Sequence, residues 1–343
     1  MSDVVLRVER GLGRITLNRP RTLNALTPGM VREIFGALGD WAGDDAVRAV
    51  LIDGAGERGL CAGGDIRGIY EHAKAGQDGP KTFWREEYLL NHRISQFPKP
   101  YIALMDGIVM GGGVGVSGHG SVRVVTERSV VGMPEVGIGF VPDVGGTFLL
   151  SRAPGELGTH AALTAARLSG SDAIHMGLAD HFVRSERLPE LVEALSEGEL
   201  DVRAFAEEPP PSELAAQRRW IDPCYSADSV EEIASRLATS GEAAGEAAAK
   251  ELLGKSPTSL KVTLQALRAA KVLDDLGECL DLEYRVACAL LERPDLVEGI
   301  RAAIIDKDRE PRWSPGRLED VDRLSVQRCF AWLGEGELGL AVR

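Results

Sequence analysis

Apolar residues in the first half of the chain form short runs that alternate with amphipathic segments. Runs rich in Val, Ile and Leu between glycines favour β-strands, and near-continuous apolar runs are typical of strands buried on both faces of a parallel sheet. Such runs occupy residues 4–9, 13–18, 48–54, 101–107 and 122–126. Helical patterns separate them at residues 28–42, 65–73 and 82–96, with short helices expected within 146–168 and 172–180. This alternation, which continues to about residue 185, predicts an α/β fold with a mainly parallel sheet.

The pattern changes at residues 187–255, which are acidic and rich in alanine. Three consecutive prolines at 209–211 favour a linker, and helices are expected after it. From Ser256, a capping serine followed by proline, the chain is predicted to be helical. One amphipathic face there is formed by Leu282, Val286, Ala289 and Leu290. We therefore predict a catalytic core at 1–186, a linker with helices at 187–255 and a helical C-terminal region at 256–343.

The composition of the chain argues against several classes of function. The chain of 343 residues carries a net charge of −13, which argues against nucleic acid as a partner because phosphates require a basic surface. Its five cysteines form no CxxC pair, which favours reduced thiols and a cytoplasmic location. The histidines form no metal-binding motif, so no metal is expected. The N-terminus lacks the apolar segment of a signal peptide, and no apolar run is long enough to predict a membrane span.

Two glycine turns are candidates for binding an oxyanion or a phosphate. Gly63–Gly64 and Gly111–Gly113 each follow a predicted strand and precede a predicted helix. Free backbone N–H groups and the positive end of the helix dipole occur at such positions. Either turn alone is explained equally well by close packing of two elements. Together, they could direct two N–H donors at one oxygen, which is how a transition-state oxyanion is stabilised.

Glu135 and Asp143 are acids within a segment that is otherwise apolar and glycine-rich. Burying a carboxylate without a partner is costly, so each is expected to be either paired or functional. The structural alternatives are an ion pair of Glu135 with Arg123 or Arg152, and a role of Asp143 as a turn residue or helix cap. As a pair beside an oxyanion hole, the two acids fit the roles of acid, base or nucleophile in acyl chemistry.

Other motifs in the sequence are weaker. Ser117 lies in GVSGHG, which does not match the GxSxG nucleophile elbow of α/β-hydrolases. Gly113, Gly115 and Gly118 spell the GxGxxG of dinucleotide-binding proteins, but the match is a single short pattern in a glycine-dense segment. Glu86 and Glu87 lie on a predicted helix, where their pattern alone places them on a solvated face.

Four motifs, in this order and spacing, resemble the crotonase (enoyl-CoA hydratase/isomerase) superfamily: ITLNRPRTLNAL, LCAGGDI, GIVMGGGVG and MPEVGIGFVPDVGG. FWREEYLLN, PDVGG, SPTSLKVTL and GIRAAIIDKDREPRW are most similar to one branch of it, the 3-hydroxyisobutyryl-CoA hydrolases. The resemblance implies a spiral of ββα units followed by a helical C-terminal region. It also implies an oxyanion hole formed by the N–H groups of Gly64 and Gly112, and an acyl contact from Glu87. Coenzyme A is expected to lie against Arg21, Ala25, Cys61, Ala62, Asp65 and Ile66.

One departure from the superfamily pattern selects the reaction. The resemblance implies that hydratases use two glutamates, and the first of them would fall on Gly115, which cannot transfer a proton. The acids implied for the hydrolase branch, Glu135 and Asp143, are both present. We therefore predict hydrolysis of an acyl-CoA, 3-hydroxyisobutyryl-CoA in valine breakdown, without a cofactor and in a possible homo-oligomer. The alternatives are an enoyl-CoA hydratase or isomerase acting through Glu135 alone, and a non-catalytic acyl-CoA-binding protein.

Overall fold

A computed structural model describes residues 2–341, which divide into two compact units that interleave along the chain. Unit 1 comprises residues 2–64, 86–132 and 167–213, and unit 2 comprises residues 65–85, 133–166 and 214–341. In the part of the chain that the structure describes, no helix is both long and apolar enough to cross a membrane.

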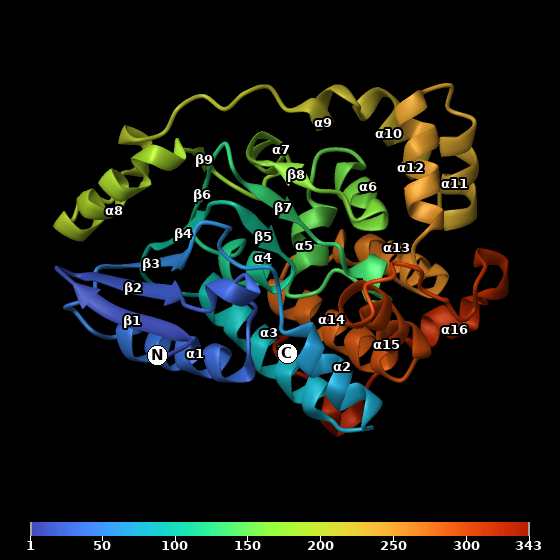
Figure 1. The fold of residues 1–343 in the computed structure, drawn as a ribbon, viewed down its shortest axis with the longest axis horizontal. Helices are drawn as coiled ribbons and strands as arrows, with labels where there is room; N and C mark the ends of the chain where they lie inside the picture. Colours follow the sequence, from blue (N-terminus) through green and yellow to red (C-terminus); the bar gives the residue numbers. More distant parts are fainter. Residues whose placement is uncertain (1, 342–343) are drawn as a thin grey trace. The chain divides into compact units, whose positions relative to one another are not determined.

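Unit 1 is built on a six-stranded sheet with the order β1-β2-β3-β4-β6-β9 (Figure 1). The strands are β1 (Val4–Glu9), β2 (Leu12–Leu17), β3 (Ala49–Gly54), β4 (Tyr101–Met105), β6 (Val122–Val125) and β9 (His181–Phe182). Only the β1–β2 hairpin is antiparallel, so the predicted mainly parallel sheet is confirmed. All five residues of β4 and the first four of β3 are buried, as expected of strands covered on both faces.

A second sheet of unit 1 carries the glycine cluster. It has the order β5-β7-β8, formed by β5 (Ile108–Met110), β7 (Val130–Gly132) and β8 (Leu168–Ser169). The helical expectation for 146–168 is therefore wrong at its end, where Leu168 pairs with Val131. The following helix is also shorter than the predicted 172–180. It begins at the capping box of Ser169 and Asp172, and left-handed Gly177 (φ +76°) follows its end.

Helices cover both faces of the six-stranded sheet. α1 packs along β1 and β2, and its predicted cap is confirmed because Thr27 accepts a hydrogen bond from the Met30 N–H. α8 packs against β3, β4 and β6 through Leu191 and Leu195. The helices of unit 1 are η1 (Pro20–Thr22), α1 (Pro28–Ala42), α4 (Gly112–Ser117), α7 (Gly170–His175), η3 (Ser185–Arg187), α8 (Leu188–Glu197) and η4 (Val202–Ala204). α3 (Gly79–Ser95) and α9 (Glu213–Ala216) each include a unit boundary.

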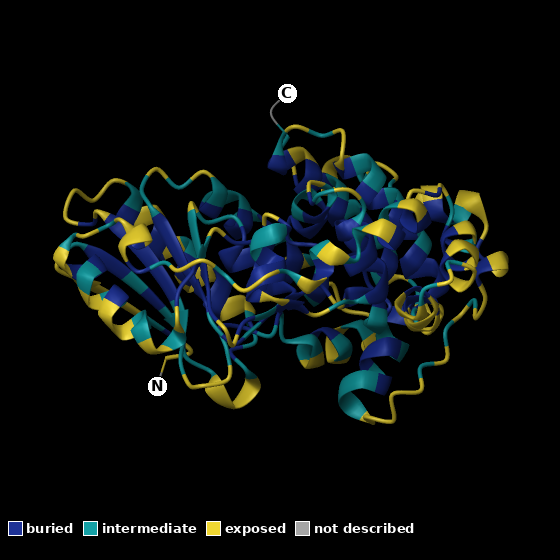
Figure 2. Cartoon of the chain, turned by 90° about the horizontal axis from the view of Figure 1, so that it is seen from above, coloured by how far each residue is buried: buried dark blue, intermediate teal, exposed yellow. Residues whose placement is uncertain are grey.

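Unit 2 is helical, which confirms the predicted helical C-terminal region. Its α-helices are α2 (Ile66–Lys74), α5 (Gly146–Ser151), α6 (Leu157–Thr164), α10 (Arg218–Tyr225), α11 (Val230–Ala238), α12 (Ala243–Leu253), α13 (Pro257–Ala270), α14 (Leu276–Leu291), α15 (Pro294–Ile300) and α16 (Arg323–Arg328). Its other turns are the 3-10 helices η2 (Glu135–Ile138), η6 (Leu318–Asp320) and η7 (Gly334–Gly336) and the π-helix η5 (Arg301–Ile305). Many helices bury one side and expose the other (Figure 2).

A buried histidine between α6 and α10 makes stability depend on pH. His160 accepts or donates a hydrogen bond at Nδ1 with the Tyr225 hydroxyl (2.9 Å) and packs edge-on against Trp220. Burial lowers the pKa of His160 from 6.5 to about 4. As the pH falls below 6.5, the unfolded chain is protonated first, so the free energy of unfolding decreases until about pH 4.

We expect this decrease to be about 3 kcal/mol for His160 alone, since one pKa unit corresponds to about 1.4 kcal/mol. The measurement is urea unfolding of wild type and His160→Gln at pH 7, 5.5 and 4. The stability advantage of the wild type over the variant should shrink by about that amount across the range. An advantage that stays constant with pH would show that His160 does not titrate in this way.

Candidate active site

The two predicted oxyanion donors lie close together in unit 1. The loop that ends at Gly64 runs alongside β5, where the Met110 N–H donates to the carbonyl of Cys61 (2.9 Å). The Gly111 N–H donates to the carbonyl of Gly132 (3.1 Å), which fixes the start of α4. Gly112 is the first residue of α4, a position whose N–H has no acceptor within the helix. Backbone hydrogen bonds beside the strands thus hold both loops next to each other.

The space around Gly112 explains why glycine is needed there. A Cβ on Gly112 would lie 2.5 Å from Oε1 of Glu87 and 3.3 Å from the backbone N of Gly64. It would also lie 3.2 Å from Cδ1 of Leu26. Such a methyl group would occupy the space between the two predicted donors, so the absence of a side chain keeps this space open.

Glu87 is the buried acid of the pair on α3. Its side chain points inward and the residue is 2% exposed, whereas neighbouring Glu86 is bonded to Arg32 on the outer side of the helix. The expectation of a solvated face is therefore correct for Glu86 and wrong for Glu87. The single-residue step rotates the second side chain by about 100° around the helix, toward Gly112. This places a carboxyl beside the two glycines.

The loop that is predicted to hold coenzyme A is shaped by Asn24. Leu23 and Asn24 adopt left-handed backbone angles, and the Asn24 amide donates to the carbonyls of Ala55 and Gly59. Arg21 is exposed in this loop, and its carbonyl accepts a bond from Arg58. The remaining predicted contacts differ in accessibility. Ala25, Ala62, Asp65 and Ile66 are half-buried, whereas Cys61 is fully enclosed.

The Cys61 thiol is buried beneath this loop and contacts its backbone. Its Sγ lies 3.2 Å from the carbonyl of Asn24, and burial raises the pKa of the thiol to about 12. The thiol is therefore neutral at physiological pH and unsuited to nucleophilic attack. Asp65 and Ile66 continue the same sequence motif into unit 2, where Asp65 is the N-cap residue of α2.

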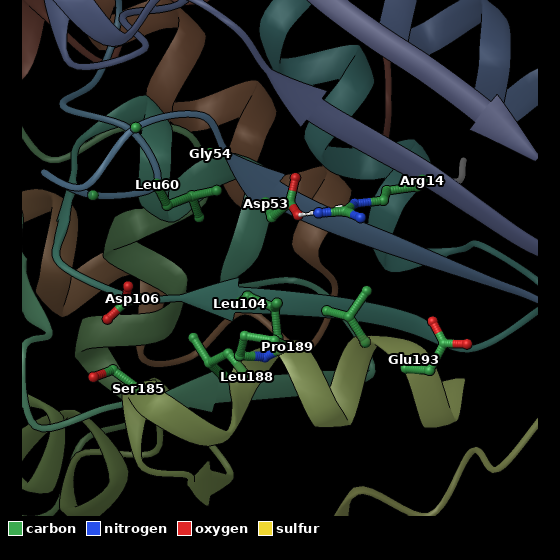
Figure 3. Close-up of a pocket in the computed structure, with 13 residues that line it drawn as sticks. Arg14, Asp53, Gly54, Leu60, Leu104, Asp106, Ser185, Leu188, Pro189 and Glu193 are labelled. Atoms are coloured by element: carbon green, nitrogen blue, oxygen red, sulfur yellow. Dashed lines mark hydrogen bonds and ion pairs between the residues drawn. The ribbon is translucent and has the colours of Figure 1, made fainter. Parts of the chain in front are cut away.

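A separate cavity of about 510 Å³ lies in unit 1 between the sheet and α8 (Figure 3). Its polar walls are largely bonded to other protein groups: Arg14 binds Asp53 on the neighbouring strand (Figure 3), and Asp106 binds Arg128. None of the residues that we predict to be functional lines this cavity. We therefore do not place the active site there.

Glu135 lies in unit 2 at the start of the short turn η2, and it is 7% exposed. The turn is anchored by left-handed Gly139 (φ +75°), where any Cβ would lie 2.2 Å from the carbonyl of Asp295. The arginines considered as structural partners are engaged elsewhere. Arg123 forms a bidentate ion pair with Asp180, and Arg152 donates to backbone carbonyls of Phe148 and Ala270.

Asp143 also lies in unit 2, in the loop between η2 and α5, and it is 5% exposed. Of the two structural alternatives for Asp143, the helix cap is wrong, because the N-cap of α5 is Gly145. The turn is confirmed, because the Gly146 N–H donates to the carbonyl of Asp143 (2.6 Å). The loop turns sharply at Val144 (φ +54°) and Gly145 (φ +79°). A positive φ is unfavourable for a β-branched residue such as Val144, so other contacts must hold the loop in this shape.

Glu283 of α14 provides such contacts, and sequence analysis missed it. One oxygen accepts from the Gly145 N–H (2.6 Å) and the other from the N–H (2.9 Å) and hydroxyl of Thr147. The predicted apolar face of α14 was partly wrong: Leu282 and Ala289 are half-buried, whereas Glu283 is 1% exposed. Glu283 is one of three acids in α14, with Glu278 and Asp281, so its residue type alone did not single it out.

The structure thus groups the predicted site residues in two sets. Within unit 1, Gly64, Gly112 and Glu87 lie together. Within unit 2, Glu135 and Asp143 are both buried on one segment, and Asp143 lies near enough to Glu283 to influence its charge. Each set therefore contains a buried carboxyl group and an unusual backbone position. In unit 1 this position is Gly112, which has no room for a Cβ, and in unit 2 it is the positive φ at Val144.

Comparisons with known proteins identify the family of the chain. A family model for enoyl-CoA hydratase/isomerase matches residues 12–330. The 3-hydroxyisobutyryl-CoA hydrolase of Danio rerio is 43% identical (99% of this chain, 92% of the relative), and that of Homo sapiens is 41% identical (98% and 90%). Both relatives are named as mitochondrial proteins.

Two solved structures are similar over nearly their full length. A carnitinyl-CoA dehydratase from Mycobacterium thermoresistibile is 51% identical with a TM-score of 0.96, covering 99% of both chains. An enoyl-CoA hydratase from Rhodobacter sphaeroides is 45% identical with a TM-score of 0.95, covering 98% of this chain and 99% of that one. These similarities confirm the crotonase-like fold, and the chain belongs to the enoyl-CoA hydratase/isomerase family.

Proposed function

We propose that this protein hydrolyses an acyl-CoA thioester, with 3-hydroxyisobutyryl-CoA as its substrate, to give 3-hydroxyisobutyrate and free coenzyme A. The observation that carries this proposal is the combination of buried Glu135 and Asp143 with Gly115. Glycine at this position has no group to donate or accept a proton during hydration of a double bond. Full-length relatives named as 3-hydroxyisobutyryl-CoA hydrolases support the same reaction.

The backbone donors would stabilise the oxyanion. As water adds to the thioester carbon, the carbonyl oxygen becomes negatively charged in the tetrahedral intermediate. The N–H groups of Gly64 and Gly112 are assigned to this oxygen, because a Cβ on Gly112 would lie 3.3 Å from N of Gly64 and glycine leaves that position empty. Each such donor is worth about 3–4 kcal/mol in the transition state.

The acids would perform the proton transfers. Glu135 acts on the thioester carbon, either directly as a nucleophile that forms an anhydride or by deprotonating the attacking water. Asp143 orients water or the 3-hydroxyl of the substrate, and it accepts or donates a proton. Glu87, enclosed beside Gly112, is assigned to a hydrogen bond with the acyl end. The carbon–sulfur bond then breaks. The CoA thiolate takes up the proton that the water has lost and leaves as a free thiol.

We further propose that coenzyme A is part of the substrate and that no additional cofactor or metal participates. Arg21, exposed on the 20–26 loop, is suited to the nucleotide phosphates. All five cysteines are free and buried, which supports a reducing compartment such as the cytoplasm, although the curated relatives are named as mitochondrial. We also propose that the protein forms a homo-oligomer and acts in valine breakdown.

The two solved relatives described as a dehydratase and a hydratase favour one competing function, addition or removal of water at an enoyl double bond. A direct comparison separates the two. Wild-type protein is incubated with 3-hydroxyisobutyryl-CoA and, separately, with crotonyl-CoA, while a thiol reagent and the enoyl absorbance are followed. Rapid thiol release from the first substrate and little loss of enoyl absorbance from the second are expected. Loss of enoyl absorbance without thiol release would overturn the proposal.

A further inference from the structure

The loop that carries Asp143 is tied to α14 through one side chain. Both oxygens of Glu283 accept backbone N–H groups, one from Gly145 and one from Thr147, so the carboxyl bridges two residues of the loop and first turn of α5. Gly145 directly follows Val144, the residue with an unfavourable positive φ, and Thr147 lies three residues after it. The hydrogen bonds of Glu283 therefore stabilise the part of the loop whose backbone conformation is least favourable.

The Glu283 carboxyl is enclosed and faces few charged or titratable groups. Asp143 faces it from the loop, and Thr147 faces it from α5. Cys279, one turn earlier on α14, lies 3.2 Å by its Sγ from the Thr147 hydroxyl and 3.8 Å from Oε1 of Glu283. Arg152, at the end of α5, acts on Cys279. The Glu283 carboxyl is thus buried next to a second acid.

We propose that Glu283 is a positioning residue for thioester hydrolysis: it holds the 143–147 loop so that Asp143 stays in its working position, and its ionisation displaces Asp143. This inference rests on the proposed role of Asp143. Two carboxylates that are both charged in an enclosed site repel each other, so the neutral form of Glu283 is the one compatible with an ionised Asp143.

The protonation of Glu283 changes within a pH range in which activity can be measured. Burial raises its pKa from 4.5 to about 8, and the nearby charge of Asp143 also raises it, whereas the Thr147 hydroxyl and the backbone N–H groups lower it. Glu283 is therefore neutral below about pH 8 in the folded protein and ionised above it. We expect kcat for thiol release to fall above this pH.

Three variants test the inference by measuring kcat and KM for thiol release between pH 6.5 and 9.5. Glu283→Gln cannot ionise and cannot accept from both backbone N–H groups. It should lower kcat about 10- to 100-fold with KM changed less than about three-fold, and it should abolish the fall above pH 8. Thr147→Val removes a donor that favours ionised Glu283, so the fall should move to higher pH. Glu278→Gln, an exposed position on the same helix, is the matched control and should match wild type.

Thr147→Val keeps the test decisive if Glu283→Gln does not fold. A profile whose midpoint is unmoved in Thr147→Val, or in a folded Glu283→Gln, overturns the inference. Asp143→Asn separates the inference from the function beneath it. If Asp143→Asn loses activity while the other two variants keep both kcat and the wild-type profile, the proposed function stands and the role of Glu283 is wrong. If Asp143→Asn is as active as wild type, the assigned role of Asp143 itself is wrong.

Discussion

Replacing Glu135 by Gln is expected to lower kcat for thiol release from 3-hydroxyisobutyryl-CoA about 1000-fold or more. The amide has nearly the same size as the carboxyl, but it can neither accept the proton of an attacking water nor attack as a nucleophile. Proton transfer by a positioned side chain contributes about 100- to 10,000-fold to enzymatic rates. Because η2 is held by backbone contacts of Gly139 and Phe140, the fold should tolerate this change.

The matched control for Glu135→Gln is Glu246→Gln, the same chemical change at an exposed position of α12 in the same unit. It should match wild type in kcat and KM. Affinity for coenzyme A should be similar in all three proteins, since Glu135 is assigned to the acyl group. A Glu135→Gln variant that keeps more than a tenth of the wild-type kcat would exclude Glu135 as the base or nucleophile. If wild type itself binds coenzyme A without turnover, a binding function is indicated.

Gly112→Ala is expected to lower kcat by about 100- to 1000-fold, the range that follows loss of one oxyanion-hole donor. The added Cβ would lie 2.5 Å from Oε1 of Glu87 and 3.3 Å from N of Gly64, which is the space assigned to the thioester oxygen. KM should rise as well, because both N–H groups remain and the added Cβ crowds the thioester oxygen in the bound substrate as well as in the transition state.

Gly36→Ala is the control for this change. Gly36 lies within α1, where a Cβ meets nothing within 4 Å, so the substitution should leave activity unchanged and slightly favour the helix. A structural effect of Gly112→Ala is checked by thermal unfolding. A variant with the melting temperature of wild type and an unchanged kcat would contradict the assignment of Gly112.

The strands were predictable because burial on both faces leaves a direct trace in the sequence. β3 and β4 read as near-continuous apolar runs, and nearly all of their residues are buried. The cap of α1 was predictable for a local reason, since Thr27 bonds a residue only three positions away. Strand β8 was not: it has two residues and exists because Leu168 reaches Val131, a partner far away in the chain.

The candidate site came from the sequence only where a motif matches the family. The resemblance implied Gly112 as a donor, which stays a prediction, and the structure adds that a Cβ has no room there. Glu87 and Glu283 show the limit of pattern reasoning. Both are acids on amphipathic helices that pattern alone assigns to solvent or ignores, and both are buried because distant segments supply their contacts. Tertiary contacts of this kind leave no periodic signal in a single sequence.

The most direct test of the proposed reaction is to run it in ¹⁸O-labelled water and determine where the label appears. Hydrolysis of the thioester breaks the carbon–sulfur bond, so the account predicts ¹⁸O in the carboxylate of 3-hydroxyisobutyrate and one free thiol for each substrate consumed. Mass spectrometry of the acid and a thiol reagent measure both in one sample. Label found on an alcohol carbon of a product still joined to coenzyme A, with no free thiol, would contradict hydrolysis and identify a hydratase.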